Sequence, residues 1–204
     1  RVQGYVTAGT SNPYNTFPET LYLQDDTGGV AVIPFPGGEI QPGTPIEVTG
    51  YAGTKNGNRI LKLSSWKVLE GNLYQYPPLE GNWDSLLDTA SNGSRLIQVE
   101  GICREIHCRE DDTLAGCLLE DTHGNTAVIQ IEDHIGGSDG NNDLHRTIRS
   151  YRTVRAIGLL HIDDYGNTVI RVRNCDEVVY VPPKADPTNP KTGDLLAFLI
   201  LILN

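Results

Sequence analysis

The sequence predicts an all-β protein of two five-stranded units in tandem, joined by a linker with a short helix. The first observation is an internal repeat, because residues 23–33 (LQDDTGGVAVI) return as residues 119–129 (LEDTHGNTAVI) with six identical positions. The second is the supply of turn residues, since 22 Gly and 12 Pro among 204 residues favour short strands over long helices. A hydrophobic share of 38% is enough for buried cores and argues against a disordered chain.

Three further pairs of matching segments keep the same order along the chain: 2–6 with 99–103, 47–50 with 155–158, and 57–63 with 166–172. The offset between copies grows from 97 to 109 residues, which indicates a tandem duplication with an enlarged loop in the second copy. This pattern divides the chain into four parts. They are a first unit at 1–75, a linker at 76–95, a second unit at 96–183 and a terminal segment at 184–204.

The strands of the first unit are expected in the following order. The first is Val2–Ala8, in which Gly4 suits a strongly bent strand. The second and third flank the tight turn at 25–29, a strong hairpin signal. The fourth and fifth are expected at Ile46–Tyr51 and Arg59–Leu63.

Two helices are expected outside these strands. In the second unit, Asp143–Thr153 is predicted as a short helix between the third and fourth strands, with Asp143 as its N-cap. In the linker, Asn82 is predicted to cap a helix over Trp83–Ala90. The apolar face of this second helix is expected to close the bottom of the second unit; it consists of Trp83, Leu86 and Leu87.

This order of elements resembles the OB-fold, a small five-stranded Greek-key barrel. Leu21–Val30 (LYLQDDTGGV), followed by Pro42-Gly43 and Val48–Gly50, is similar to OB-fold modules of bacterial proteins that work outside the cytoplasm. In such proteins these modules accompany secreted nucleases, phosphatases and metallohydrolases. The resemblance implies two tandem OB-fold barrels with a non-catalytic accessory, binding or spacer role. We therefore expect no catalytic residue and no cofactor here, and any hydrolase domain of the parent protein before Arg1.

The end of the chain carries a second resemblance. An apolar run at 195–203 follows five residues that are similar to the cell-wall sorting signal of Gram-positive surface proteins: Asn189, Pro190, Lys191, Thr192 and Gly193. The resemblance implies that a sortase cysteine attacks the Thr192–Gly193 bond and that the threonine carboxyl passes to a peptidoglycan amine. The run is shorter than the ~20 residues a membrane-spanning helix needs, so no stable span is expected. These residues imply an extracellular, cell-wall-attached protein.

Outward-facing strand residues are candidate ligand contacts, because aromatic side chains on strands two and three of OB barrels stack bases or sugars. Strand alternation places four such residues on the outside of the first unit: Tyr5, Tyr22, Tyr51 and Lys62. The matching positions of the second unit hold Ile102, Leu118, Leu159 and Arg171.

One alternative function is therefore a module that binds single-stranded nucleic acid or glycan on the first barrel. The second barrel would bury its equivalent face against the linker or its neighbour. The other interpretation is that the four outward residues of the first unit are ordinary strand residues that bind no ligand.

A metal site in the second half is a further alternative. The soft ligands that cluster there are Cys103, His107, Cys108, Cys117 and His123. The four cysteines also permit one or two disulfides in three pairings, or buried thiols, and we assign no metal ligand. Pairs of aspartates in turns would suit calcium, although turn formation explains them equally.

The formal charge of −10 argues against a protein that binds mainly to the phosphate backbone of nucleic acid. Most of that charge lies in residues 81–183, whereas residues 1–80 are close to neutral. One basic cluster interrupts the acidic half, with four arginines at every third position: Arg146, Arg149, Arg152 and Arg155. These arginines are expected either to pair with nearby acids or to form an anion-binding face.

Overall fold

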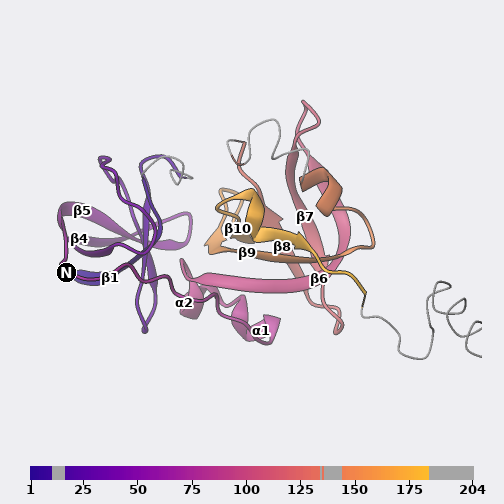
Figure 1. Cartoon of the computed structure of the whole chain (residues 1–204), viewed down its shortest axis with the longest axis horizontal. Coiled ribbons are helices and arrows are strands. Elements are labelled where there is room, and N and C mark those ends of the chain that lie inside the picture. The colour runs from indigo at the N-terminus through magenta and orange to yellow at the C-terminus, as the bar shows by residue number, and fades with distance from the viewer. Residues whose placement is uncertain (11–16, 134, 136–143, 184–204) are drawn as a thin grey trace, which may run out of the picture.

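The computed structural model describes residues 1–10, 17–133, 135 and 144–183, and within them the chain folds into two closed five-stranded barrels (Figure 1). This confirms the predicted all-β fold of two tandem OB-fold barrels with a linker that contains short helices. No helix in the described part of the chain is long and apolar enough to cross a membrane.

The first barrel contains β1 (Val2–Ala8), β2 (Leu21–Gln24), β3 (Gly29–Val32), β4 (Pro45–Lys55) and β5 (Asn58–Val68). It closes in the order β1-β2-β3-β5-β4, with β3 and β5 parallel. Leu21, Leu23 and Val48 lie in its core, as alternation requires. The predicted ends of the fourth and fifth strands were wrong. The two strands form one long ribbon in which β4 runs on to Lys55 and β5 to Val68, and most residues beyond the predicted ends are exposed, which an apolar pattern cannot reveal.

The second barrel contains β6 (Leu96–Cys108), β7 (Leu114–Glu120), β8 (Thr126–Gln130), β9 (Thr153–Ile162) and β10 (Thr168–Arg171). Pairing between β10 and β9 closes it, and β11 (Val178–Tyr180) adds a strand along β9 that the repeat did not predict.

The predicted helix at 143–153 was too long. The structure is helical at residues 144–147, and β9 begins at Thr153. Its proposed cap, Asp143, lies outside the described residues. Tyr151 has a positive φ of 65°, which a helix does not allow.

The linker holds two short helices, α1 (Trp83–Leu86) and α2 (Thr89–Asn92), in place of the single helix predicted over Trp83–Ala90. Asn82 caps α1 as expected, since its side chain accepts a bond from the Asp84 N–H. The Asp88 side chain accepts from the Ala90 N–H and so starts a new helix where one had been expected to continue. Trp83 and Leu86 lie in the core of the second barrel.

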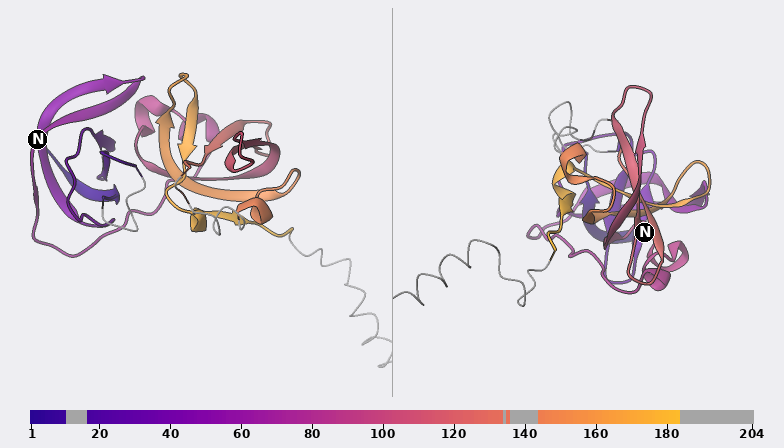
Figure 2. Two further views of the ribbon diagram at one scale, coloured as in Figure 1. Left: turned by 90° about the horizontal axis from the view of Figure 1, so that it is seen from above. Right: turned by 90° about the vertical axis from the view of Figure 1, so that its right-hand side faces the viewer.

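The two barrels lie side by side (Figure 2), and they share an apolar cluster. The first barrel contributes Ala8, Phe17, Tyr22, Ala31 and Ile60, and the second contributes Leu96 and Leu159. Buried hydrogen bonds accompany this cluster. The Leu96 N–H donates to Gln24 Oε1 at 2.9 Å, and Arg173 donates to the Thr7 carbonyl. The outward faces of β2 and β3 are therefore covered by the second barrel.

Candidate binding cleft between the barrels

A cleft of about 340 Å³ opens beside this apolar cluster, where the first barrel meets β8, β9 and β10. Its apolar wall includes Ala31, Ile33 and Ile60. Its polar wall comes mainly from the second barrel, with Gln130 on β8 and His161 on β9. This volume lies at the small end of the range for pockets that bind small ligands.

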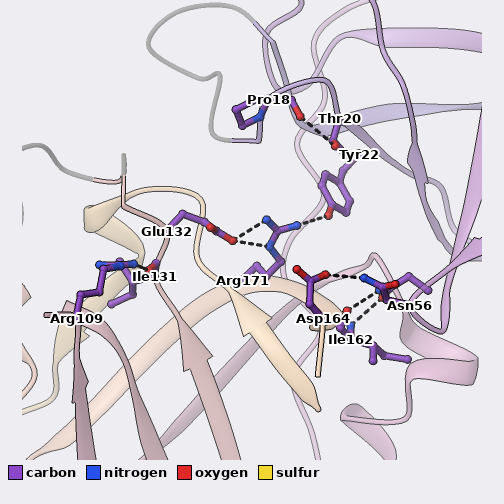
Figure 3. A network of polar contacts seen from close by, with 11 residues as sticks. Pro18, Thr20, Tyr22, Asn56, Arg109, Ile131, Glu132, Ile162, Asp164 and Arg171 are labelled. Carbon is purple, nitrogen blue, oxygen red and sulfur yellow. Dashed lines mark hydrogen bonds and ion pairs between the residues drawn. The ribbon is translucent and has the colours of Figure 1, made fainter. Parts of the chain in front are cut away.

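Arg171, at the end of β10, organises one side of the cleft (Figure 3). Its guanidinium donates to Glu132 Oε1 from Nε at 3.1 Å and from Nη2 at 2.6 Å, and to the Tyr22 hydroxyl oxygen from Nη1 at 2.9 Å. The same group lies over the Phe17 ring, 4.2 Å from its centroid. Burial raises the pKa of Tyr22, and this outweighs the opposing effect of the Arg171 charge, so the phenol keeps its proton.

The tip of the β4–β5 hairpin forms the opposite rim and contacts the second barrel. Asn58 exchanges two hydrogen bonds with the backbone of Ile162, at 2.6 Å and 2.8 Å. Asn56 Nδ2 donates to Asp164 Oδ1 at 2.5 Å, as Figure 3 shows. The tip of the β4–β5 hairpin therefore holds in place the turn that carries Asp164 and Tyr165.

Two buried polar atoms of residues that line the cleft have no hydrogen-bond partner: Gln130 Oε1 and His161 Nδ1. A buried polar atom without a partner costs about 1–3 kcal/mol, so a polar partner for these atoms would be favourable. Burial, followed by the nearby charge of Arg171, lowers the pKa of His161 to about 4. The imidazole is thus neutral at physiological pH.

The pKa of His161 predicts how stability depends on pH. The unfolded side chain titrates near 6.5 and the folded one near 4, so the folded state binds this proton less tightly. The contribution of His161 to the free energy of unfolding is therefore fully present above pH 6.5. It falls by up to about 3 kcal/mol as the pH drops towards 4. Urea unfolding at pH 7, 5.5 and 4.5 should show this decline in the native chain and a flatter profile in His161→Gln. An equal decline in both would contradict the assignment.

The four outward residues predicted on the first barrel do not form one site. Tyr22 faces the second barrel and is 1% exposed, whereas Tyr51 is 75% exposed. Lys62 is exposed beside Tyr51 on the ribbon, since it pairs with it across the β4–β5 ladder. Tyr5 packs edge-on against Tyr74 and Tyr76, which follow β5, with ring centroids 5.2 Å and 6.0 Å away. Tyr22 therefore lines the cleft and is not part of an open aromatic face.

The matching residues of the second barrel are also divided, but at other positions of the repeat. Leu159 is fully buried in the cluster between the barrels, and Arg171 lines the cleft. Ile102 and Leu118 are half-buried on the outer face of β6 and β7.

The other candidates from the sequence have simpler roles. None of the four cysteines, all within the described ranges, forms a disulfide, and Cys103 and Cys117 are buried. Among the residues with described positions, no group of three His, Cys, Asp or Glu side chains could hold a metal ion. Arg155 pairs with the acid Glu100, as the first of the two interpretations expected, and Arg152 lies over the Tyr180 ring. The residues of the sorting signal, Asn189–Gly193, lie outside the described part of the chain.

His161, Gln130 and Asn58 are cleft residues that the sequence did not single out. Alternation does place His161 on the same side of β9 as Leu159, two residues earlier, and that signal could have been used. Nothing in the sequence indicated that Asn58 would reach the other barrel.

Comparison with known proteins finds likenesses among solved structures. No protein-family model matches the chain, and no curated protein matches it. Among solved structures, the chain is similar to a deletion mutant of the single-stranded DNA binding protein from Thermus aquaticus. The two are 13% identical, the match covers 92% of this chain and 95% of that chain, and the TM-score is 0.31. A likeness at this level carries no argument about function, so the cleft is interpreted from its own geometry.

Proposed function

We propose that the chain is a non-catalytic binding unit of a larger cell-surface protein and that its ligand enters the cleft between the barrels. The observation that carries the proposal is the cleft itself, a space of about 340 Å³ walled by both barrels and lined by residues with polar atoms that lack partners. The shared apolar cluster and the bonds of Asn58 and Arg173 hold its two walls together. A preorganised site of this kind loses little entropy on binding.

The likeness of Asn189–Gly193 to a sorting signal supports a place of action outside the cell. A sortase would cleave between Thr192 and Gly193 and join Thr192 to a peptidoglycan amine, which leaves both barrels outside the cell. Pro190 supports this proposal because it favours the extended backbone that an enzyme groove accepts. The unit would then act as the accessory part of an extracellular hydrolase.

The sorting signal makes a direct prediction. When the chain is incubated with a panel of sortases and triglycine, mass spectrometry should find residues 1–192 joined to triglycine. Thr192→Ala should abolish this product, and Thr188→Ala, just outside the five residues, should leave it unchanged. Cleavage at another bond, or no product with any sortase of the panel, would contradict cell-wall attachment.

Binding of single-stranded nucleic acid on the first barrel is the second candidate. The cluster of Tyr5, Tyr74 and Tyr76 favours it, because Tyr74 is 46% exposed and offers a ring for stacking. The covered face of β2 and β3 weighs against it, since that is where OB barrels stack their ligands.

A further inference from the structure

We infer that the cleft between the barrels binds an uncharged, hydroxyl-rich ligand, the terminal sugar residues of a glycan. This inference rests on the proposed function, because it names the class of ligand for the same cleft. Four features of the cleft support it: the type of its polar groups, its charge, its apolar surfaces and its size.

Several polar groups of the cleft can accept hydrogen bonds. Gln130 Oε1 has no partner, and Asp164 uses one carboxylate oxygen to hold Asn56. Glu132 binds Arg171 through Oε1 alone. These acceptors suit a ligand with many hydroxyl donors, and each bond to a carboxylate is stronger than a neutral one.

The charges exclude a polyanion. The basic residues Lys55 and Arg171 line the cleft together with three acids, Glu132, Asp163 and Asp164. Arg171 is already engaged with Glu132, Tyr22 and the Phe17 ring. Phosphate binding needs hydrogen-bond donors and an excess of positive charge, and the acidic residues of this cleft outnumber its basic ones. A neutral ligand is not repelled by these acidic residues.

Apolar surfaces complete the match with a sugar. Ala31, Ile33 and Ile60 form an apolar wall, and the Tyr165 ring stands at the rim with 91% of its surface exposed. An exposed aromatic ring can pack against the C–H face of a sugar ring while its hydroxyl stays in water. Since the volume is near the lower limit for a small-ligand pocket, the cleft fits the end of a glycan chain.

Calorimetric titration of the whole chain with neutral hexasaccharides tests the inference, with chitohexaose, cellohexaose and mannohexaose as probes. At least one should bind, and Tyr165→Ala and Gln130→Leu should each weaken it tenfold or more. Both variants should keep the native melting temperature or exceed it, because Tyr165 is exposed and Gln130 Oε1 has no protein partner to lose. Tyr51→Ala is the matched control, because Tyr51 is also an exposed tyrosine but does not line the cleft, and this variant should bind like the native chain.

A 15-nucleotide oligo-dT serves as the charged comparison. Sugar binding should be almost unchanged between 50 and 200 mM salt, whereas a phosphate-dominated interaction weakens steeply over that range. If no hexasaccharide binds but another small molecule binds in a Tyr165-dependent manner, the inference is wrong and the proposed cleft stands. If a sugar or the oligo-dT binds and Tyr51→Ala abolishes it while Tyr165→Ala does not, both the inference and the cleft are wrong. Failure of every ligand overturns both as well.

Discussion

Gly50→Ala is expected to lower the free energy of unfolding by about 3 kcal/mol, because it forces a methyl group into the backbone of a neighbouring strand. A Cβ at Gly50 would lie 2.1 Å from the carbonyl oxygen of Lys62, far inside van der Waals contact. The matching glycine of the second barrel is equally crowded, since a Cβ at Gly158 would lie 2.5 Å from the carbonyl oxygen of Arg171. Both copies thus use a glycine to bring their fourth strand close to the fifth.

Urea unfolding followed by circular dichroism measures this effect. Gly28→Ala is the matched control, because a Cβ there meets nothing within 4 Å and the change should stay within about 0.5 kcal/mol. Equal unfolding midpoints for Gly50→Ala and Gly28→Ala would show that the close approach of the two strands is not required.

Leu159→Asp is expected to lower the free energy of unfolding by more than about 3 kcal/mol. Leu159 is fully buried between Tyr22, Ile60 and Leu96, so an aspartate would place a charge in the apolar cluster that joins the barrels. The barrels should separate while each keeps its own core. Small-angle scattering should therefore show a larger radius of gyration, and unfolding should change from one transition to two.

The control for this variant is Leu118→Asp, which changes a half-buried leucine on the outer face of β7, outside the shared cluster. It should leave the radius and the single transition unchanged. If Leu159→Asp behaves like Leu118→Asp in both measurements, the apolar cluster does not hold the barrels together.

The sequence could predict the strands because an OB barrel is built from local patterns that the duplication shows twice. Alternation predicted that Tyr22 and Leu159 both point away from their own barrel cores, and they do. What lies opposite them depends on how two barrels dock, and no periodicity within a strand contains that information. The outward face of the first barrel was therefore interpreted as an open ligand surface, whereas β2 and β3 are covered.

The cleft was harder to predict for the same reason. Asn58 begins β5 directly after the turn at 56–57, where an asparagine is usually a turn former, yet its side chain bonds to Ile162 of the other barrel. His161 was one of five histidines in the sequence, and its significance depends on its burial beside Arg171. Long-range contacts of this type appear when the chain is folded, so residue spacing alone could not assign them.

The most direct test of a ligand site between the barrels is a map of backbone amide chemical shifts during titration with the hexasaccharide that binds best. The amides of Gln130, His161 and Tyr165 should shift together and saturate with one affinity. Shifts confined to Tyr5, Tyr51 and Lys62 would place the ligand on the open side of the first barrel and contradict the cleft.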